Sequence, residues 1–293
     1  MTYSIVAHDP ETGAMGVAVQ SHWFNVGGVV TWARAGVGAV ATQSVVEPAY
    51  GLRLLDRLAA GTAPRDALAQ LLADDPTPEY RQVAVVGVDG DVAVHTGERC
   101  IAYAGHADGR GYSAQANIMA SEAVWPAMAR AYEQASGPLQ RRLAVALHAA
   151  EAAGGDVRGR QSAALVVVPA TGEAHERLVD VRVDDHPEPL AELDRLLDLT
   201  DAYGLATEGD DLTAEGRLEE AGDRYERASA LAPGNHELLF WSGMGAANSG
   251  DMPTALARVR EAIAVQPGWR DLLGRLGEDV APSAAAVLAA LDG

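Results

Sequence analysis

The sequence predicts an α+β fold in which a layered sandwich is followed by an all-helical domain. Three observations predict it. Over residues 1–186, short apolar runs joined by turn residues alternate with pairs of helices, an order that favours layered antiparallel sheets over a doubly wound parallel sheet. No Gly-x-Gly-x-x-Gly follows the first strand, which argues against dinucleotide binding. Over residues 187–293 the pattern is helical only.

The first elements are two predicted hairpins. YSIVAH and AMGVAVQ are short β-rich runs joined by DPETG, whose Asp, Pro and Gly supply turn geometry. A second hairpin is expected within VGGVVTWARAGVGAVATQ. Its Gly36 and Gly38 allow backbones to approach closely or accommodate a bulge.

Two helix pairs and further strands follow. YGLRLLDRLAAG and PRDALAQLLADD predict the first helix pair, the former with its leucines on one face. RQVAVVGVDGDVAVHTG contains Asp89-Gly90 between two alternating runs, a strong hairpin signal. Helices at about 122–136 and 139–153 then precede the strands SAALVVV and RLVDVRV.

The helical region has a 34-residue period that becomes visible when Pro233 is aligned with Pro267. Small residues then coincide in pairs, which suits helices that must approach closely. This stretch, about 202–280, resembles the tetratricopeptide repeat, and the resemblance implies a concave surface for a peptide or partner protein. The matched positions are Gly209 with Gly243, Gly216 with Gly250, Ala221 with Ala255 and Ala228 with Ala262, and Gly277 extends the first series.

Composition excludes several classes of function. The formal net charge is -19, and all 22 basic residues are arginine, so binding to a phosphate backbone is not expected and no lysine is available for Schiff-base or P-loop chemistry. Cys100 stands alone, which rules out a disulfide framework or a cysteine-rich metal site within one chain. With no signal-peptide pattern and no apolar run of roughly 18 residues, a cytoplasmic protein without membrane contact is expected.

Thr2 is the first candidate catalytic residue. Removal of Met1 would make Thr2 the amino terminus at the start of a strand. Its hydroxyl could then attack a carbonyl while its own α-amine, with a reference pKa near ~8, accepts the proton. Such a site also needs donors for an oxyanion and a nearby cation or polar network. Ser4 in the same strand is an alternative anchor, and a positioned water is a third possibility.

Three stretches, together with the order of elements, resemble the N-terminal nucleophile (Ntn) hydrolases. Arg34 lies where proteasome-like members place a lysine, although a guanidinium stays protonated and gives electrostatic support only. In GGDVRGRQS, Asp156 and Gly159 match an Asp-x-x-small-residue turn. GYSAQANIM leads from a strand region into a helix, where that superfamily places a serine near the amine.

Residues 1 to about 186 closely resemble the domain of unknown function 1028 family, a bacterial group with an Ntn-hydrolase-like fold. The motifs that carry the resemblance are SIVAHDPETGAMGVAVQS, AGVGAVATQ, YG at 50–51, RQ at 81–82, TGERC, QANIM and GGDVRGRQSAAL. The resemblance implies a four-layer αββα sandwich and cleavage of an amide carbon–nitrogen bond. It leaves the substrate open.

Polar residues near predicted strand ends are the candidate substrate ligands. Uncharged amide and hydroxyl groups suit a carbonyl, amide or ureido group, and they equally suit the pairing of buried backbone groups. His-x-His and His-Glu-x-x-His spacings are absent from the sequence, so neither a metal nor a cofactor is expected. The candidate binding residues are Ser21, His22, Gln43, Ser44, Gln115, Asn117, Arg158 and Gln161.

Two functional hypotheses follow. The first is a hydrolase of a small amide, lactam or ureido compound, or of a small peptide, with Thr2, Arg34 and Asp156 as its catalytic residues and a covalent acyl-enzyme. The second is a non-catalytic protein that binds a small ligand or acts as a scaffold whose repeats recruit a partner. Sheet edges and flat apolar surfaces favour a homodimer, and Trp23, Phe24 and Trp32 are expected in the core or at a subunit interface.

Overall fold

The computed structural model describes residues 2–292, and the chain divides into two compact units, Met1–Asp194 and Arg195–Gly293. Met1, whose removal the sequence hypothesis requires, lies outside the described residues. The division falls inside a long helix, whereas the sequence placed a boundary after residue 186, shortly before that helix begins.

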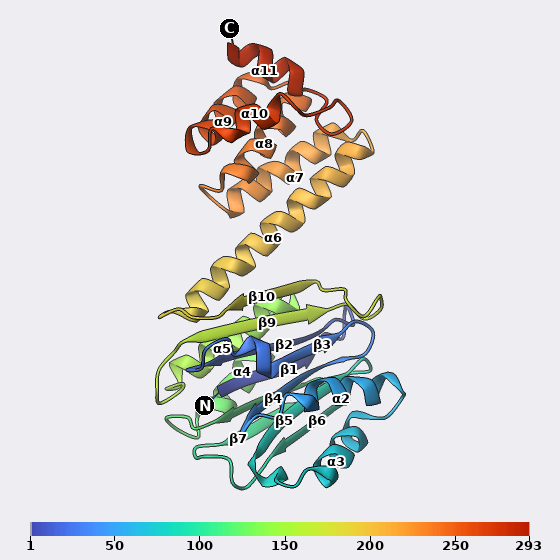
Figure 1. Ribbon diagram of the computed structural model, residues 1–293, viewed down its shortest axis with the longest axis vertical. Coiled ribbons are helices and arrows are strands. Elements are labelled where there is room, and N and C mark those ends of the chain that lie inside the picture. The colour runs from blue at the N-terminus through green and yellow to red at the C-terminus, as the bar shows by residue number, and fades with distance from the viewer. Residues whose placement is uncertain (1, 293) are drawn as a thin grey trace. The chain divides into compact units, whose positions relative to one another are not determined.

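The first unit contains a six-stranded antiparallel sheet (Figure 1). The first hairpin of the chain lies at its centre, because β1 pairs with β2 on one side and with β8 on the other. Thr2 is therefore the first residue of an interior strand. In spatial order the strands are β10 (Val179–Val183), β9 (Ser162–Val168), β2 (Met15–Ser21), β1 (Thr2–His8), β8 (Tyr112–Asn117) and β7 (Gly105–Gly109).

The second sheet has four antiparallel strands in the order β3 (Thr31–Arg34), β4 (Gly38–Ser44), β5 (Arg81–Gly87) and β6 (Val92–Thr96). The predicted turn at Asp89-Gly90 connects β5 and β6, and Gly90 has φ +81° there. The second hairpin begins later than its sequence suggests, because a short helix, α1 (Gly27–Val30), precedes β3.

The two sheets face each other, and each carries helices on its outer side. Helices α2 (Ala49–Ala59) and α3 (Pro64–Asp74) pack on the four-stranded sheet, followed by a short 3-10 turn at Pro78–Tyr80. Helices α4 (Val124–Gln134) and α5 (Leu139–Ala152) pack on the six-stranded sheet. The predicted α+β class with antiparallel sheets is confirmed for this unit.

One hairpin was only partly foreseen. The sequence indicated a strand region near GYSAQANIM, and the structure forms β8 there, but the partner strand β7 carries little signal of its own. Its sequence, GHADG, begins and ends in glycine and contains Asp108. Glycine and aspartate are depleted in strands, so only the pairing with β8 explains this strand.

Helices alone form the second unit within the described residues, and the 34-residue period maps onto their packing. Gly209 lies against Tyr225 and Gly243 against Val259, where a Cβ would come within 3 Å of the neighbouring side chain. The matched alanines Ala221, Ala228, Ala255 and Ala262 are buried. The helices are α6 (Pro189–Ala214), which begins in the first unit, α7 (Leu218–Leu231), α8 (His236–Asn248), α9 (Met252–Val265), α10 (Gly268–Leu273) and α11 (Ala284–Asp292).

The glycines Gly216 and Gly250 end equivalent helices. They follow α6 and α8 with φ of +76° and +88°, the left-handed conformation that glycine adopts most easily after a helix. Gly277, which continues the series of Gly209 and Gly243, lies outside a helix, between α10 and α11, whereas those two glycines lie inside α6 and α8. The 34-residue period therefore does not continue as a third pair of long helices. In the described part of the chain, no helix has the length and apolar character needed to cross a membrane.

Candidate active site

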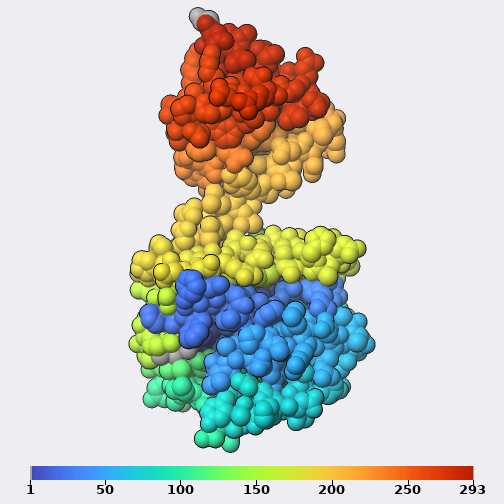
Figure 2. All heavy atoms as spheres, in the orientation of Figure 1, coloured from blue at the N-terminus to red at the C-terminus, as the bar shows by residue number. Residues whose placement is uncertain are grey.

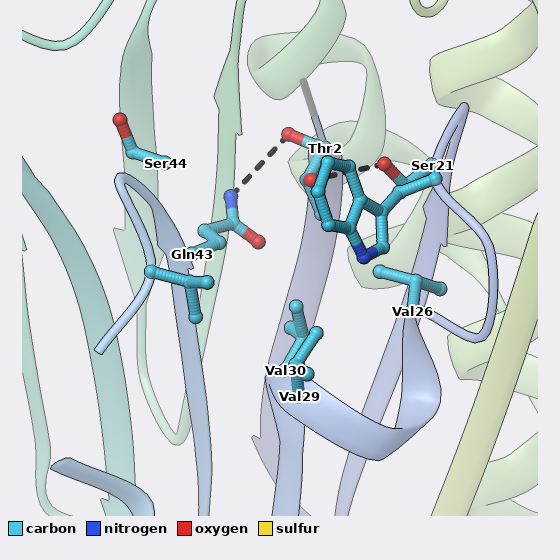
Figure 3. Close-up of a pocket in the computed structure, with 9 residues that line it drawn as sticks. Thr2, Ser21, Val26, Val29, Val30, Gln43 and Ser44 are labelled. Carbon is cyan, nitrogen blue, oxygen red and sulfur yellow. Dashed lines mark hydrogen bonds between the residues drawn. The ribbon is translucent and has the colours of Figure 1, made fainter. Parts of the chain in front are cut away.

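A small cavity lies where the first residues of β1 meet the ends of β2 and β4 (Figure 3). Its volume is about 80 Å³. Thr2 borders it and is 6% exposed. The Thr2 hydroxyl lies 3.1 Å from the hydroxyl of Ser21. The full lining consists of Thr2, Ser21, Trp23, Val26, Val29, Val30, Gln43, Ser44 and Val46.

Valines of the α1 region form the apolar wall of this cavity. Val26, Val29 and Val30 come from the short helix and the residue before it, and Figure 3 shows them opposite Thr2. The helix is anchored at its start, where the Val26 backbone N–H donates to Ser162 Oγ at 3.1 Å. At its end, the Thr31 hydroxyl donates to the Gly27 carbonyl at 2.8 Å. The sequence GGVV at 27–30, which was predicted as part of a strand, thus forms a helical turn held at both ends.

Gln43 connects the cavity to the interior. Its side-chain N–H donates to the Thr2 carbonyl at 3.3 Å and to Gln82 Oε1 at 2.7 Å, while its Oε1 accepts from Ser4 Oγ at 2.7 Å. Because β1 lies in one sheet and β4 in the other, Gln43 ties the two sheets together at Thr2. Its role is to position the first residue of β1.

Gln82 is the centre of this buried network, and the sequence did not single it out as a site residue. Its Oε1 accepts from Gln43 and from Asn117 Nδ2, and its Nε2 donates to Thr96 Oγ1 and to the Gly105 and Ala116 carbonyls. A signal was present. In RQVAVVG, Gln82 shares the inward face of β5 with Ala84 and Val86, and an amide in that series needs internal partners.

The network also accounts for three other candidates. Gln115 Nε2 donates to Ser4 Oγ at 2.6 Å, and Asn117 Nδ2 donates to Gln82 at 2.9 Å. All three residues, Ser4, Gln115 and Asn117, are completely buried and do not border the cavity. The structure therefore places the predicted ligands Gln115 and Asn117 behind the cavity, and it places the alternative nucleophile Ser4 inside the network.

The cavity has no ionisable side chain in its lining, which consists of hydroxyl, amide, indole and aliphatic groups. A Thr2 hydroxyl that reacted there would find no side-chain base in the wall. Arg34, expected to support the site with its charge, is elsewhere. Its guanidinium pairs with Asp56 at 2.8 Å and borders a different cavity, because Arg34 ends β3 at the far side of that strand from Thr31 and α1.

Asp156 and its neighbours lie next to the cavity without bordering it. The Asp156 carboxylate is buried, accepts the His22 backbone N–H at 3.1 Å, and pairs with Arg158 at 3.2 Å. It thereby holds the chain immediately after Ser21. The His22 ring lies 3.3 Å from the Arg160 carbonyl. Asp156 is thus a positioning residue for the end of β2.

Gln161 does not border the Thr2 cavity, and of the two places expected for Trp23 and Phe24, the core or a subunit interface, the structure excludes the core. The Gln161 side chain donates to Asp185 at 3.1 Å, away from Thr2, although its backbone N–H donates to the Ser21 carbonyl. Trp23 and Phe24 are 57% and 64% exposed, so neither belongs to the core, because both follow β2 in a loop at the sandwich end. Trp23 borders the cavity instead.

Backbone strain gathers around the same end of the sandwich. Among residues 2–292, the non-glycine residues with positive φ are Asn25 at +51°, Ser44 at +73° and Ile118 at +57°. Ser44 lines the cavity, Asn25 follows the Trp23 loop, and Ile118 follows the strand partner of Thr2. A β-branched residue with positive φ is an outlier, and such strain concentrates at functional sites.

Metal ligation finds no support in the described residues, which contain no cluster of three or more His, Cys, Asp or Glu side chains suited to hold an ion. The groups at the cavity are those that bind or attack a neutral polar molecule: two hydroxyls, an amide and a third hydroxyl at Ser44. They surround a mostly aliphatic space.

Comparison with known proteins identifies a family but no reaction. A family model described as "Family of unknown function (DUF1028)" matches residues 2–193. The crystal structure of protein SPO2555 from Silicibacter pomeroyi, described with the same family model, is similar to this chain. The TM-score is 0.62 with 33% sequence identity, over 67% of this chain and 87% of that chain. Among curated proteins none matches. With its first unit matched almost from end to end, this chain belongs to the DUF1028 family of unknown function.

Proposed function

We propose that the protein is an Ntn-type amidohydrolase that uses Thr2 as its nucleophile to cleave a small amide, lactam or ureido carbon–nitrogen bond. One observation carries the proposal. Thr2 borders a cavity whose wall contains no side-chain base. This supports a mechanism in which the α-amine of Thr2, once Met1 is removed, accepts the proton of its own hydroxyl.

The reaction follows from these groups. Thr2 Oγ1 bonds to the substrate carbonyl carbon as its proton passes to the α-amine. The carbon–nitrogen bond then breaks, the leaving amine takes up that proton, and an ester of Thr2 remains. Water hydrolyses this ester to the carboxylic acid and restores the hydroxyl. Burial at the sheet interior disfavours the charged form of an amine, which suits a base.

The architecture supports the proposal at a finer level than the fold class. Two facing antiparallel sheets, each with a helix pair outside, support a four-layer αββα arrangement like that of Ntn hydrolases, in which an amino-terminal strand carries the nucleophile. Here β1 lies within the six-stranded sheet and opens onto the inter-sheet space. Gln43 and Asp156 hold its surroundings in place.

The cavity wall defines a substrate class. Four valines and one indole line the cavity together with three hydroxyls and an amide, and no charged side chain borders the space. A carboxylate on the acyl part would lose its hydration without gaining an ion pair, which is costly. At about 80 Å³ the cavity accepts a short, neutral, aliphatic acyl group, with the leaving amine toward the exposed Trp23.

The test uses a matched set of 4-nitroanilides: acetyl, butyryl, hexanoyl and succinyl. We expect release of nitroaniline from the short neutral members and none from the succinyl compound. Intact-protein mass spectrometry should show a chain that begins at Thr2 and, at early times, an adduct equal to the acyl group. Thr2→Ala should abolish release and Thr2→Ser should retain it.

Two results would refute this proposal. One is an active preparation in which Met1 is retained. The other is a folded Thr2→Ala protein with unchanged turnover, which would assign the reaction to a positioned water. Arg65→Gln, at an exposed position of α3, serves as the matched control and should leave turnover unchanged.

A second candidate function is favoured by the helical unit. Its 34-residue period and its small residues at helix contacts support a tetratricopeptide-like module, and such modules bind peptides or partner proteins. A cavity of about 450 Å³ between the start of this unit and the α7–α8 loop is a candidate groove. Leu231, 45% exposed, borders it.

This scaffold function predicts that the full chain retains a partner protein through Leu231. Leu231→Asp should weaken co-purification of that protein, and Thr2→Ala should not affect it. Equal retention by the Leu231→Asp chain would contradict it. The expected homodimer is tested separately by sedimentation of the full chain, where a single monomeric species at all concentrations would exclude it.

A further inference from the structure

A second cavity of about 430 Å³ lies on the first unit, between the β3 edge and the β9–β10 hairpin. In Figure 2, blue atoms of the early chain border yellow-green atoms of the β9–β10 region on one face. The cavity is distinct from that of Thr2. Its lining is Gly27, Gly28, Thr31, Trp32, Ala33, Arg34, Leu52, Leu55, Val166, Ala174, Arg177, Asp180 and Arg182.

Three arginines and a single carboxylate border this space. Arg34 ends β3, whereas Arg177 and Arg182 come from the stretch that leads into and forms β10. Asp180 is the one acidic lining residue. The lining thus carries a net positive charge on a chain whose formal net charge is -19. An acidic protein repels anions in general. The arginines of this cavity make it a region of the surface that attracts anions instead.

Arg177 is the member with no carboxylate partner among the described residues. Its guanidinium donates to the Ala174, Glu176 and Ala33 carbonyls at 3.1, 2.8 and 3.1 Å. Those bonds fix the side chain across the gap between the β9–β10 connection and β3, while its charge stays uncompensated. A fixed guanidinium binds a carboxylate or phosphate with less loss of side-chain entropy than a free one.

The other two arginines pair with exposed carboxylates. Arg34 contacts Asp56, whose side chain is 67% exposed, and Arg182 contacts Asp180 at 3.4 Å, whose side chain is 39% exposed. Exposed ion pairs of this kind contribute little, so either arginine can turn to a bound anion at small cost. Both guanidiniums remain available at the cavity.

Apolar groups complete the wall. The Trp32 ring is held against Gly51, where a Cβ would lie 2.2 Å from the indole, and its N–H donates to the Val29 carbonyl at 3.2 Å. Leu52 and Leu55 lie beside it. Gly27 and Gly28 of α1 border this cavity, while Val29 and Val30 border that of Thr2. The two cavities therefore share α1 as a common wall.

We propose that this cavity, here named the arginine cavity, binds a small organic anion whose carboxylate or phosphate contacts Arg177 and Arg182 and whose aromatic or aliphatic part packs against Trp32 and Leu52. Guanidinium groups pair with both kinds of anion through two parallel hydrogen bonds. The proposal is independent of the chemistry at Thr2.

The test titrates the full chain with phenyl phosphate, benzoate and benzamide by calorimetry. The two anions share a ring with the neutral amide, so the comparison isolates the charge, and their ranking distinguishes phosphate from carboxylate. We expect saturable binding of at least one anion, weakened by added salt, and at least about tenfold weaker binding of benzamide.

Variants locate the binding. Arg177→Gln and Arg182→Gln should each lower the affinity for the anion by about tenfold. Arg65→Gln, at an exposed position outside this cavity, should leave the affinity unchanged. Two arginine variants are used so that one misfolded protein leaves the other as evidence. Equal affinity in all three variants, equal binding of benzamide, or no saturable binding of either anion would overturn the proposal.

Discussion

The space between the two sheets has an apolar end and a polar end, and the same strands build both. On its inward face β1 changes from Val6 to Ser4 and Thr2 along its length, and β5 changes from Val86 and Ala84 to Gln82. β2, β4 and β9 change in the same sense, from valine or alanine to Ser21, Gln43 and Ser162. The polar ends coincide at the Thr2 cavity.

The difference separates two kinds of stabilisation. At the apolar end, close packing and removal of surface from water are sufficient. At the polar end, each buried amide is costly unless every partner is present. The apolar end needs only close packing, whereas the polar end adds buried amides that folding does not require. Such local departures from an apolar core are typical of functional sites.

The largest expected effect on stability comes from replacing Gln82, the centre of the buried amide network. Gln82→Leu leaves Gln43, Asn117 and two backbone carbonyls without their partner. At about 1–3 kcal/mol for each buried group left unpaired, with partial relaxation, we expect a loss of about 3–5 kcal/mol in unfolding free energy. Urea denaturation measures it.

Gln134→Leu is the matched control, since Gln134 is exposed near the end of α4. It should change the unfolding free energy by less than about 0.5 kcal/mol. If Gln82→Leu were as stable as this control, the amide network would contribute nothing and the contrast between the two ends would fail.

The next effect concerns the apolar end. Val17 is fully buried and lies between Val6 and Val166 in the register of the sheet. Val17→Ala removes two methyl groups and leaves a small cavity, for an expected loss of about 2–3 kcal/mol. It should not alter anilide turnover or anion binding. A loss of turnover at a temperature where the variant stays folded would show that the ends are not separable.

Most of the fold was readable from the chain because the apolar end obeys simple periodicities. Alternation over YSIVAH and AMGVAVQ predicted the β1–β2 hairpin, and the Asp89-Gly90 turn predicted the β5–β6 hairpin; both are confirmed. Where tertiary contacts decide, the prediction was wrong. GGVV reads as strand but forms α1, because Ser162 and Thr31 bond its ends. β7 exists only through β8.

The candidate site was predicted only in part. Thr2, Ser21, Gln43 and Ser44 meet at one cavity, since all four lie at strand ends that the hairpin order brings together. Arg34 was placed by analogy of spacing alone, and spacing along a chain does not fix the direction in which a strand end points. No motif in the sequence indicated the arginine cavity, because its lining comes from four stretches, 27–34, 52–55, 166 and 174–182, that only the fold brings together.

A charged anchor on the other face of the four-stranded sheet, beneath α2 and α3, gives a third effect, which depends on pH. Asp75 accepts from Arg81 and from Tyr50, and hydrogen bonding by Arg81 lowers the Asp75 pKa from 3.8 to about 2. The stability it contributes is full above pH 3.8 and is lost as the pH falls through about 2. Asp75→Asn should therefore cost about 2 kcal/mol at neutral pH and almost nothing near pH 2.

Denaturation curves at pH 7, 4 and 2 measure this difference. A cost for Asp75→Asn that stayed constant across the three values would show that the carboxylate charge is irrelevant to this anchor. Tyr50 reinforces the expected sign, because burial and the hydrogen bond to Asp75 raise its pKa well above the usual value and keep the phenol a donor throughout.

The smallest expected effect comes from Ser4, which belongs to the buried amide network and does not border the Thr2 cavity. Ser4→Ala removes one hydroxyl that accepts from Gln115 Nε2 at 2.6 Å and donates to Gln43 Oε1 at 2.7 Å. Because those two amide atoms approach the same hydroxyl, a small rotation pairs them with each other, and we expect a loss of only about 1 kcal/mol. Turnover of the butyryl anilide should persist, since Ser4 does not border the cavity. If turnover disappeared while the protein stayed folded, the nucleophile would have to be reassigned from Thr2 to Ser4.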